Sequence, residues 1–416
     1  MSIRGKFPEQ RPTLNLDFAN SKKLDPRITF SRTTTSTCVD ENGLIVTTGA
    51  DEPRFDHDPT TGESLGLLIE EQRKNQVTYS EDFTQWNNTN TTDAVDTSIN
   101  APDGTNTATK ITDDSTNAAH NVKFNFTTNT GTTFTVSCFV KKGDFSYFIM
   151  VLRMIANSED VTAKFDFDNP SNNTTFGGGT NRSQTVTEYP NGWYRISLTS
   201  TFGAAVTSVI PHIHLTDSGG STSYSGSGNF NYIWGAQLEI GEFPTSYIPT
   251  SGSTVTRNAD NVTMTGTNFS DWYNQDEGTV YVSQKLKAVQ DTSRNNMVYL
   301  INTDGNGSDY FYNTKIGERN IFVFGDGGTN YSRFQDGTDS TDTKTAFAYD
   351  VSGDNFKPYY NGIESTTETD NNTPSATSHN QLTLGASSGG KYCGHISKFT
   401  YYPSRLPNDQ LQSLTK

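Results

Sequence analysis

The chain has 416 residues and a formal net charge of −15, with no lysine-rich run. This balance argues against nucleic acid or an anionic membrane as the partner, because phosphate binding requires concentrated lysine and arginine. Hydrophobic residues make up 31% of the chain, aromatic residues make up 12%, and glycine occurs 35 times, which is typical of many short strands joined by polar turns. The length suits two β domains of ordinary size.

No apolar run is long enough to span a bilayer, and the N-terminal residues lack the apolar core of a signal peptide. We therefore expect neither membrane insertion nor secretion by the usual route. The three cysteines, Cys38, Cys138 and Cys393, are widely separated, so they predict neither a disulfide framework nor a zinc site. Synthesis in a reducing cytoplasm is the simpler interpretation.

Residues 1–76 contain short strand-like pieces at 14–19, 27–32 and 43–46, separated by turns. Their apolar residues are too few and too scattered to form a core of normal size. We therefore predict that residues 1–76 form an extended N-terminal arm that docks on another structure.

Strand patterns dominate residues 77–250. Apolar and polar side chains alternate in segments 134–141 and 193–199, which is the period of two expected of a half-buried antiparallel strand. In the second segment, Trp193 and Arg195 fall on the polar side. The loops between these segments are rich in glycine, serine, asparagine and threonine, which cannot pack a core. The region predicts one β domain.

Residues 232–240 alternate so regularly that Trp234 is predicted in the core and Glu239 on a solvent-facing side. Glu239 and Glu242 are separated by an odd interval, so they would point to opposite faces of a regular strand. A glycosidase instead needs two carboxylates that flank one bond from a shared cleft. The pattern argues against such a pair, although Gly241 could break the register and hide one.

Residues 251–416 follow a proline-interrupted stretch and contain a second set of strands. The dipeptide Asn361-Gly362 is the strongest hairpin signal in the chain. Pro407 and the leucines after it predict one short terminal helix. The predicted fold class is all-β: an N-terminal arm, then two antiparallel jelly-roll or β-sandwich domains at 77–250 and 251–416, then the short C-terminal helix.

Two parts of the chain, residues 12–86 and 232–257, resemble virion-associated proteins of tailed bacteriophages, notably those that infect marine bacteria; they include the stretches LNLDFANSKKLDPRITFSR and WGAQLEIGEFPTSYIPTSGSTVTR. In that group the middle portion is similar to the jelly rolls of carbohydrate-binding modules. The C-terminal portion is similar to concanavalin A or laminin G-like sandwiches. The resemblance implies a non-enzymatic structural or adhesive part of a virus particle, made in the cytoplasm of the host bacterium and located on the virion.

Aromatic side chains on an exposed sheet face are candidate sugar-binding residues, because a flat ring loses little entropy when it stacks on a sugar. Trp193 and Arg195 form one such candidate, and the alternative is that Trp193 packs beneath a loop. A second candidate glycan contact is formed by Tyr310, Tyr312 and Tyr331. The alternative for these tyrosines is that they are core residues or cross-strand pairs.

Two groups of residues are candidate metal ligands. Asp304, Asn306 and Asp309 supply oxygen atoms at the spacing of a calcium-binding loop, although a plain hairpin turn would have the same composition. His212 and His214 point to one side of a strand, but no third ligand has a suggestive spacing. Calcium is therefore the one cofactor that the sequence suggests.

The leading hypothesis is a phage tail fibre or receptor-binding appendage that contacts host surface polysaccharide. The arm would attach it to other virion proteins, and a homo-oligomer such as a trimer would add avidity. One alternative is a capsid or neck decoration protein with a purely structural role. Another is a glycosidase that trims surface polysaccharide. Glycan binding separates the first two hypotheses, and release of reducing ends would identify the third.

Overall fold

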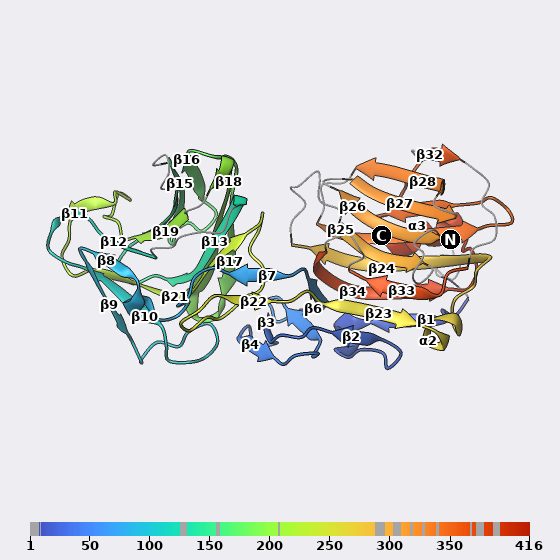
Figure 1. The fold of residues 1–416 in the computed structure, drawn as a ribbon, viewed down its shortest axis with the longest axis horizontal. Coiled ribbons are helices and arrows are strands. Elements are labelled where there is room, and N and C mark those ends of the chain that lie inside the picture. Colours follow the sequence, from blue (N-terminus) through green and yellow to red (C-terminus); the bar gives the residue numbers. More distant parts are fainter. Residues whose placement is uncertain are drawn as a thin grey trace, which may run out of the picture.

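The chain folds into two lobes that lie side by side, each built from packed β-sheets (Figure 1). The computed structural model describes residue 8 and residues 10–124, 131–154, 159–206, 209–287, 296–302, 309–316, 319–326, 329–337, 341–366, 368–371, 378–385 and 392–416. The predicted all-β class with antiparallel sandwich domains and a short C-terminal helix is confirmed. Among the described residues, no helix is both long enough and apolar enough to cross a bilayer.

The central sandwich, which we define as the strands between Asn87 and Ile240, forms one lobe. Its two main sheets have the strand orders β17-β18-β13-β21-β10-β9 and β16-β15-β14-β19-β12-β8. Alternate residues of facing strands, such as Val136 and Met150, fill the space between the sheets, as the period of two predicted. The strands are β8 (Asn87–Thr89), β9 (Thr91–Val95), β10 (Thr109–Asp113), β11 (Asn117–Ala119), β12 (Asn121–Lys123), β13 (Gly131–Lys141), β14 (Tyr147–Met154), β15 (Glu159–Asp166), β16 (Thr174–Gly177), β17 (Thr180–Tyr189), β18 (Trp193–Val206), β19 (Val209–His214), β20 (Ser223–Ser225) and β21 (Phe230–Ile240).

The C-terminal sandwich forms the other lobe. One sheet has the order β31-β30-β29-β24-β34-β6-β5, with β1 also paired to β34, and the other has the order β2-β23-β33-β25-β26-β27-β28-β32. Asn361 and Gly362 both have positive φ, at 43° and 79°, as the predicted tight hairpin requires. The terminal helix α3 (Asn408–Thr415) buries Leu411 against this sandwich.

The strands and short helices of the C-terminal sandwich come from both ends of the chain. From the N-terminal part they are β1 (Leu14–Asp17), α1 (Phe18–Ser21), β2 (Thr29–Ser31), β5 (Arg54–His57) and β6 (Ser64–Glu70). From the C-terminal part they are β23 (Asn261–Thr265), α2 (Thr267–Ser270), β24 (Glu277–Leu286), β25 (Asn296–Asn302), β26 (Tyr310–Ile316), β27 (Arg319–Asp326), β28 (Thr329–Gly337), β29 (Asp342–Asp350), β30 (Lys357–Tyr360), β31 (Ile363–Glu364), β32 (Glu368–Asn371), β33 (Gln381–Leu384) and β34 (Cys393–Tyr402).

The N-terminal segment therefore differs from the separate arm that the sequence suggested. Strand β1 pairs with β34, with Leu16 opposite Phe399, and β6 pairs with another part of the same edge of β34, whose other edge pairs with β24. Leu16 and Leu67 lie in the C-terminal core. Residues 1–76 show no core of their own because their apolar partners come from the C-terminal part of the chain, such as Phe399 opposite Leu16. In Figure 1 these strands are the blue arrows within the orange and red lobe.

The two lobes meet at short strand pairings. The segments that form these pairings precede or follow the central sandwich in the sequence. Strand β7 (Arg73–Asn75) pairs with β22 (Val255–Arg257), and β3 (Ser36–Val39) forms a hairpin with β4 (Ile45–Thr48). Figure 1 shows all four strands at the base of the notch between the lobes. The remaining described elements are the 3₁₀ turns η2 (Phe83–Gln85) and η3 (Pro190–Gly192).

Strand β21 departs from the regular alternation that the sequence suggested. Its register against β13 shifts between Ser137 and Phe139, and Gly235 has a φ of 62°, which a β-bulge with glycine accommodates. Trp234 consequently packs on the outer face of its sheet, whereas Leu238 reaches the core between the sheets. Trp234 is buried as predicted, but on the opposite side of the sheet from Leu238.

Candidate functional site: the cleft between the two sandwiches

A cluster of buried ion pairs joins the segments at the base of the junction. We call it the junction cluster; its members are Arg32, Arg54, Glu70, Arg257 and Asp260, and each is 0–1% exposed. The guanidinium of Arg54 lies 2.6 Å from the Glu70 carboxylate and also contacts Asp260, which in turn lies 2.9 Å from Arg32. Arg257 lies 3.5 Å from Glu70. These charges are buried because each has an opposite partner, without which burial would be very costly.

Glu70 is bound from several sides within the junction cluster. Besides the arginines, it accepts hydrogen bonds from the backbone amide of Ser246, at 2.9 Å, and from its hydroxyl, at 2.6 Å. Burial alone would raise the pKa of Glu70, but Arg257, Arg54 and Lys287 outweigh burial and hold that pKa well below its ordinary value. Glu70 is therefore a carboxylate at neutral pH, and it ties segment 245–250 to strand β6.

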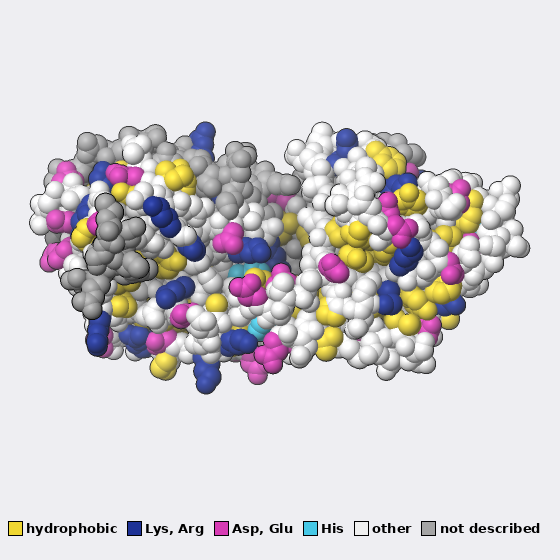
Figure 2. All heavy atoms as spheres, turned by 180° about the vertical axis from the view of Figure 1, so that it is seen from behind, with side chains coloured by type: hydrophobic (Ala, Val, Ile, Leu, Met, Phe, Trp, Pro, Cys, Tyr) yellow, Lys and Arg dark blue, Asp and Glu magenta, His cyan; other side chains and the backbone are white. Residues whose placement is uncertain are grey.

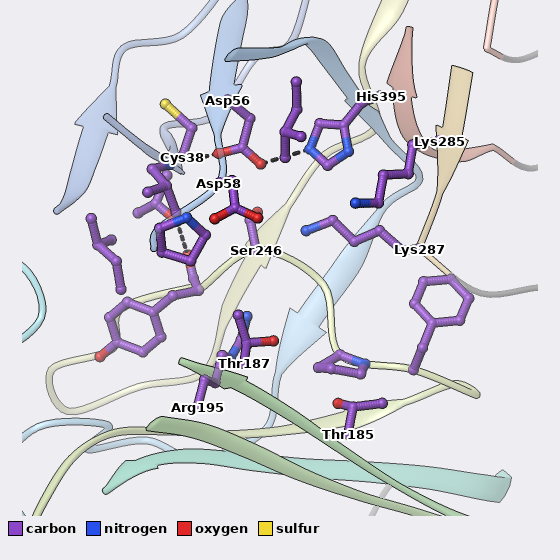
Figure 3. A pocket seen from close by; sticks show the side chains of 18 of the residues that line it. Cys38, Asp56, Asp58, Thr185, Thr187, Arg195, Ser246, Lys285, Lys287 and His395 are labelled. Atoms are coloured by element: carbon purple, nitrogen blue, oxygen red, sulfur yellow. Dashed lines mark hydrogen bonds and ion pairs between the residues drawn. The ribbon is translucent and has the colours of Figure 1, made fainter. Parts of the chain in front are cut away.

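A cleft of about 470 Å³ opens beside the junction cluster, between the central and C-terminal sandwiches. In Figure 3, Thr185, Thr187 and Arg195 rise into it from strands β17 and β18, and Lys285, Lys287 and His395 face them from the other lobe. Figure 2 shows basic, acidic and histidine side chains gathered where the lobes meet. The remaining lining residues come from the β3–β4 hairpin, the segment around Asp56 and the segment at 242–247.

One wall of the cleft is held by a hydrogen-bonded carboxylate. Asp56 lies 2.7 Å from Nε2 of His395 and accepts the backbone N–H of Val39, also at 2.7 Å. Burial would raise the pKa of Asp56, but the bond to His395 and the charges of His395 and Lys287 keep that pKa below its usual value. Asp56 is therefore ionised and already hydrogen-bonded, and it fixes the side chain of His395 at the rim of the cleft.

Asp58 lies lower on the same wall and caps its own turn. It accepts the backbone amides of Thr60 and Thr61, each at 2.9 Å. Burial alone would raise the pKa of Asp58, but these bonds and the nearby Lys285 together outweigh burial and bring the pKa below its ordinary value. Asp58 also remains a carboxylate at neutral pH.

Among the candidate binding and metal-ligating residues whose side chains the structure describes, Arg195 is the one that lies in this cleft. Its guanidinium donates to the carbonyl of Thr245, at 2.8 Å, and to the hydroxyl of Ser137, at 3.0 Å. Within the described part of the chain it forms no salt bridge. It therefore brings a positive charge to the cleft that only neutral groups solvate.

Trp193 is not on an exposed sheet face, which corrects the expectation of a sugar platform at this residue. It is 1% exposed, and its indole N–H donates to the carbonyl of Asn100, at 2.9 Å. The side of the sheet was predicted correctly, but that side is covered by Val39, Ile45 and Tyr247 among others. A ring enclosed in this way cannot stack on a sugar.

Glu239 is likewise buried, at 0% exposure, and not directed to solvent. Its carboxylate accepts the amide of Thr245, at 3.0 Å, and the hydroxyl of the same residue, at 2.6 Å. It therefore anchors the chain as it returns across the sheet. Glu242, in contrast, lines the cleft. The two glutamates do not face one another across a groove.

The predicted tyrosine contact is described only in part. Tyr310 and Tyr312 are half-buried on β26, with ring centroids 5.7 Å apart, and neither lines the cleft. The side chain of Tyr331 lies outside the described residues, as do Asp304 and Asn306. Asp309 accepts a hydrogen bond from Ser378, at 3.0 Å. Among the residues that the structure describes, no three histidine, cysteine or acidic side chains are grouped as metal ligands would be.

His212 and His214 stack on one another on the central sandwich, with ring centroids 5.8 Å apart. Burial lowers the pKa of each to about 4, helped by Arg153 near His212 and by His212 near His214. In the unfolded chain each would titrate near 6.5, so between pH 6.5 and 4 the unfolded chain binds more protons than the folded one. Stability should therefore fall as the pH is lowered through this window.

The double substitution His212→Asn and His214→Asn should flatten this pH dependence. Each histidine is expected to contribute a slope of roughly 1.4 kcal/mol per pH unit between its folded and unfolded pKa values. Urea unfolding of the wild type and the variant at pH 7, 6, 5 and 4.5 measures the difference. An unchanged slope in the variant would show that these two histidines do not titrate differently on folding.

Most residues of the cleft were missed at the sequence level; Arg195 was a candidate, and Glu242 was considered only as half of a carboxylate pair. Lys285 and Lys287 follow one another at a spacing of two at the end of β24, which places them on the same side of the chain. That spacing was the available signal. It could not be interpreted without knowing that β17, from the other domain, lies opposite.

The comparisons with known proteins give only distant likenesses. No family model matches the chain, and no curated protein matches it. Among solved structures, the CBM40 domain of the Ruminococcus gnavus IT-sialidase bound to α2,3-sialyllactose is 19% identical, with 34% of this chain and 84% of that chain covered and a TM-score of 0.29. The NanB sialidase of Streptococcus pneumoniae is 17% identical, with 37% and 26% covered and a TM-score of 0.30.

A third similar solved structure is the binding domain of botulinum neurotoxin DC in complex with rat synaptotagmin II. It is 8% identical, with 37% of this chain and 39% of that chain covered and a TM-score of 0.30. At these scores the likeness assigns no function. The functional argument therefore rests on the geometry of the cleft.

Proposed function

We propose that this protein is a non-enzymatic glycan-binding component of a bacteriophage virion, and that the cleft between its sandwiches holds the sugar. The carrying observation is the cleft itself: about 470 Å³, walled by two sheet domains and lined by hydrogen-bonding side chains. Clefts between domains with few fixed polar groups are the usual places for small-ligand sites. The virion location follows the sequence resemblance over residues 12–86 and 232–257, and the carbohydrate-binding role follows the similarity of the middle portion of that group to carbohydrate-binding modules.

The lining of the cleft suits a saccharide better than an apolar ligand. Hydroxyl groups of Thr185, Thr187 and Ser246 and the charged groups of the two lobes can exchange hydrogen bonds with sugar hydroxyls. The aromatic residues of the lining, Phe139, Tyr189, Phe243 and Tyr247, are buried. The hydrogen-bonding groups of the cleft therefore carry the proposal.

The proposal is non-enzymatic because Asp56 and Asp58, two of the three carboxylates of the cleft, are poorly suited to general acid catalysis. A glycosidase needs one carboxyl group whose pKa is raised enough to hold a proton for the leaving group. The pKa values of Asp56 and Asp58 are lowered instead, and Asp56 is occupied by His395. An assay for reducing ends released from host polysaccharide tests this point, and sustained release would replace binding by hydrolysis as the function.

Attachment to the virion would multiply a weak contact. One cleft of this size gives modest affinity, but several copies on one particle raise the overall affinity steeply without any new contact. We propose that the protein is a tail-fibre or receptor-binding component present in several copies, with a trimer as the expected unit. Antibody labelling of purified virions tests the location, and light scattering of the purified protein tests the copy number.

Substitution of Thr187 by tryptophan should abolish glycan binding without destabilising the fold. Thr187 is exposed on β17 and projects into the cleft, so a large ring at this position would occupy the space of the sugar. Binding is measured on a glycan array and on host cells with fluorescent protein. Unchanged binding by Thr187→Trp would move the site elsewhere, and no binding by the wild type would favour a structural decoration role.

The matched control is Thr92→Trp. Thr92 is also an exposed threonine on an edge strand, β9, of the same sheet, but it does not line the cleft. The control variant places the same ring at the opposite edge of the sheet. The control is expected to bind like the wild type, and both variants should keep the wild-type thermal midpoint.

A further inference from the structure

The charges around the cleft point to the chemical class of the sugar. Resting on the proposed glycan-binding function, we infer that the cleft selects an anionic saccharide, one that bears a carboxylate or a sulfate, and that Lys285 and Lys287 bind the acidic group. The protein as a whole carries a formal charge of −15. The cleft nevertheless carries a local excess of positive charge, and in such an acidic chain that excess requires an explanation.

The junction cluster is the first source of that excess. Arg32, Arg54 and Arg257 bring three positive charges against two negative charges, from Glu70 and Asp260, and all five side chains are buried. Buried charges are screened by solvent and salt much less than exposed ones. The cluster therefore projects a net positive potential into its surroundings, and Ser246, which hydrogen-bonds Glu70, also lines the cleft.

The two lysines add to this potential from the wall of the cleft. Lys287 lies 3.6 Å from Glu70, a carboxylate that the arginines of the cluster already neutralise. Lys285 is exposed and forms no salt bridge with the described residues. Figure 3 shows both ammonium groups directed into the cavity, with Arg195 opposite. Two ammonium groups side by side repel one another, and an anion between them removes that cost.

The acidic groups of the cleft do not cancel this excess. Asp56 is paired with His395, and Asp58 is bound by the backbone amides of its own turn. Glu242, in the segment after β21, is the third acidic residue that lines the cleft. Against these three carboxylates stand Arg195, Lys285, Lys287 and the net charge of the cluster. The balance favours an anion, and the carboxylates supply acceptors for the neutral hydroxyls of the same sugar.

The test uses an array that displays uronic-acid oligosaccharides beside their methyl esters, and sulfated galactans beside their desulfated forms. Binding that Thr187→Trp removes is attributed to the cleft. We expect acidic members to bind at least about tenfold more tightly than their neutral counterparts, with the difference shrinking at high salt. Preference within the uronic-acid pair identifies a carboxylate, and preference within the sulfated pair identifies a sulfate.

The lysine itself is tested by Lys285→Gln, which should lose most of the preference for the acidic member of each pair. The control, Lys23→Gln, removes the same charge from an exposed lysine that does not line the cleft and should bind like the wild type. Equal affinity for acidic and neutral members, still sensitive to Thr187→Trp, overturns the inference and leaves the glycan site standing. Absence of any binding to the array overturns both.

Discussion

Glu70→Gln is expected to lower the free energy of unfolding by roughly 3–5 kcal/mol, the usual cost of removing one partner of a buried ion pair. The substitution removes the negative charge that Arg54 and Arg257 share: Arg54 keeps Asp260, whereas Arg257 loses the carboxylate that lies 3.5 Å away. It also weakens the two hydrogen bonds to Ser246. Denaturant unfolding of the full chain measures the loss.

The matched control is Glu41→Gln, which removes the same charge from an exposed ion pair. Glu41 lies 3.3 Å from Lys22, and these side chains are 69% and 42% exposed. Exposed pairs contribute on the order of 0–1 kcal/mol, so this variant should unfold nearly as the wild type does. A Glu70→Gln variant as stable as Glu41→Gln would contradict the role given to the junction cluster.

Trp193→Ala is expected to destabilise the protein by about 3–5 kcal/mol, as truncation of a buried aromatic residue does. Trp193 is 1% exposed and packs with Phe139, Tyr189 and Trp234 in the cluster on the outer face of the sheet. The effect should appear in the free energy of unfolding, whereas a folded fraction of the variant should still bind glycan at low temperature.

A second variant separates packing from hydrogen bonding at the same position. Trp193→Phe keeps a ring but loses the N–H bond to Asn100, so it should cost less than the alanine variant. If Trp193→Ala were as stable as the wild type and failed to bind glycan, Trp193 would be a sugar platform after all, and the structure's placement of this ring would be contradicted.

The fold class could be predicted from the sequence because it depends on local alternation. The period of two in segments 134–141 and 193–199 gave the strands and the correct sides, and Asn361-Gly362 gave its hairpin. The place of residues 1–76 could not be predicted in this way. Their strands pair with β34, so the information that fixes them is a match between surfaces hundreds of residues apart.

The candidate site was less accessible to sequence reasoning for a related reason. The alternation of apolar and polar residues placed Trp193 on the polar side of its strand, but only the fold shows that Tyr247 and the β3–β4 hairpin cover that side. Glu239 was assigned to solvent for the same reason and is buried by the returning segment. A cleft between lobes is built from residues that each domain presents separately, and no single stretch of sequence contains it.

The most direct test of the cleft as the glycan site is hydrogen–deuterium exchange of the full chain with and without host surface polysaccharide. Slower exchange on binding should be concentrated in β17, around Thr187, and in the segment at 285–287, the two walls of the cleft. Slower exchange confined to other surfaces, such as β14 and β19 of the central sandwich, or no change anywhere, would contradict the account.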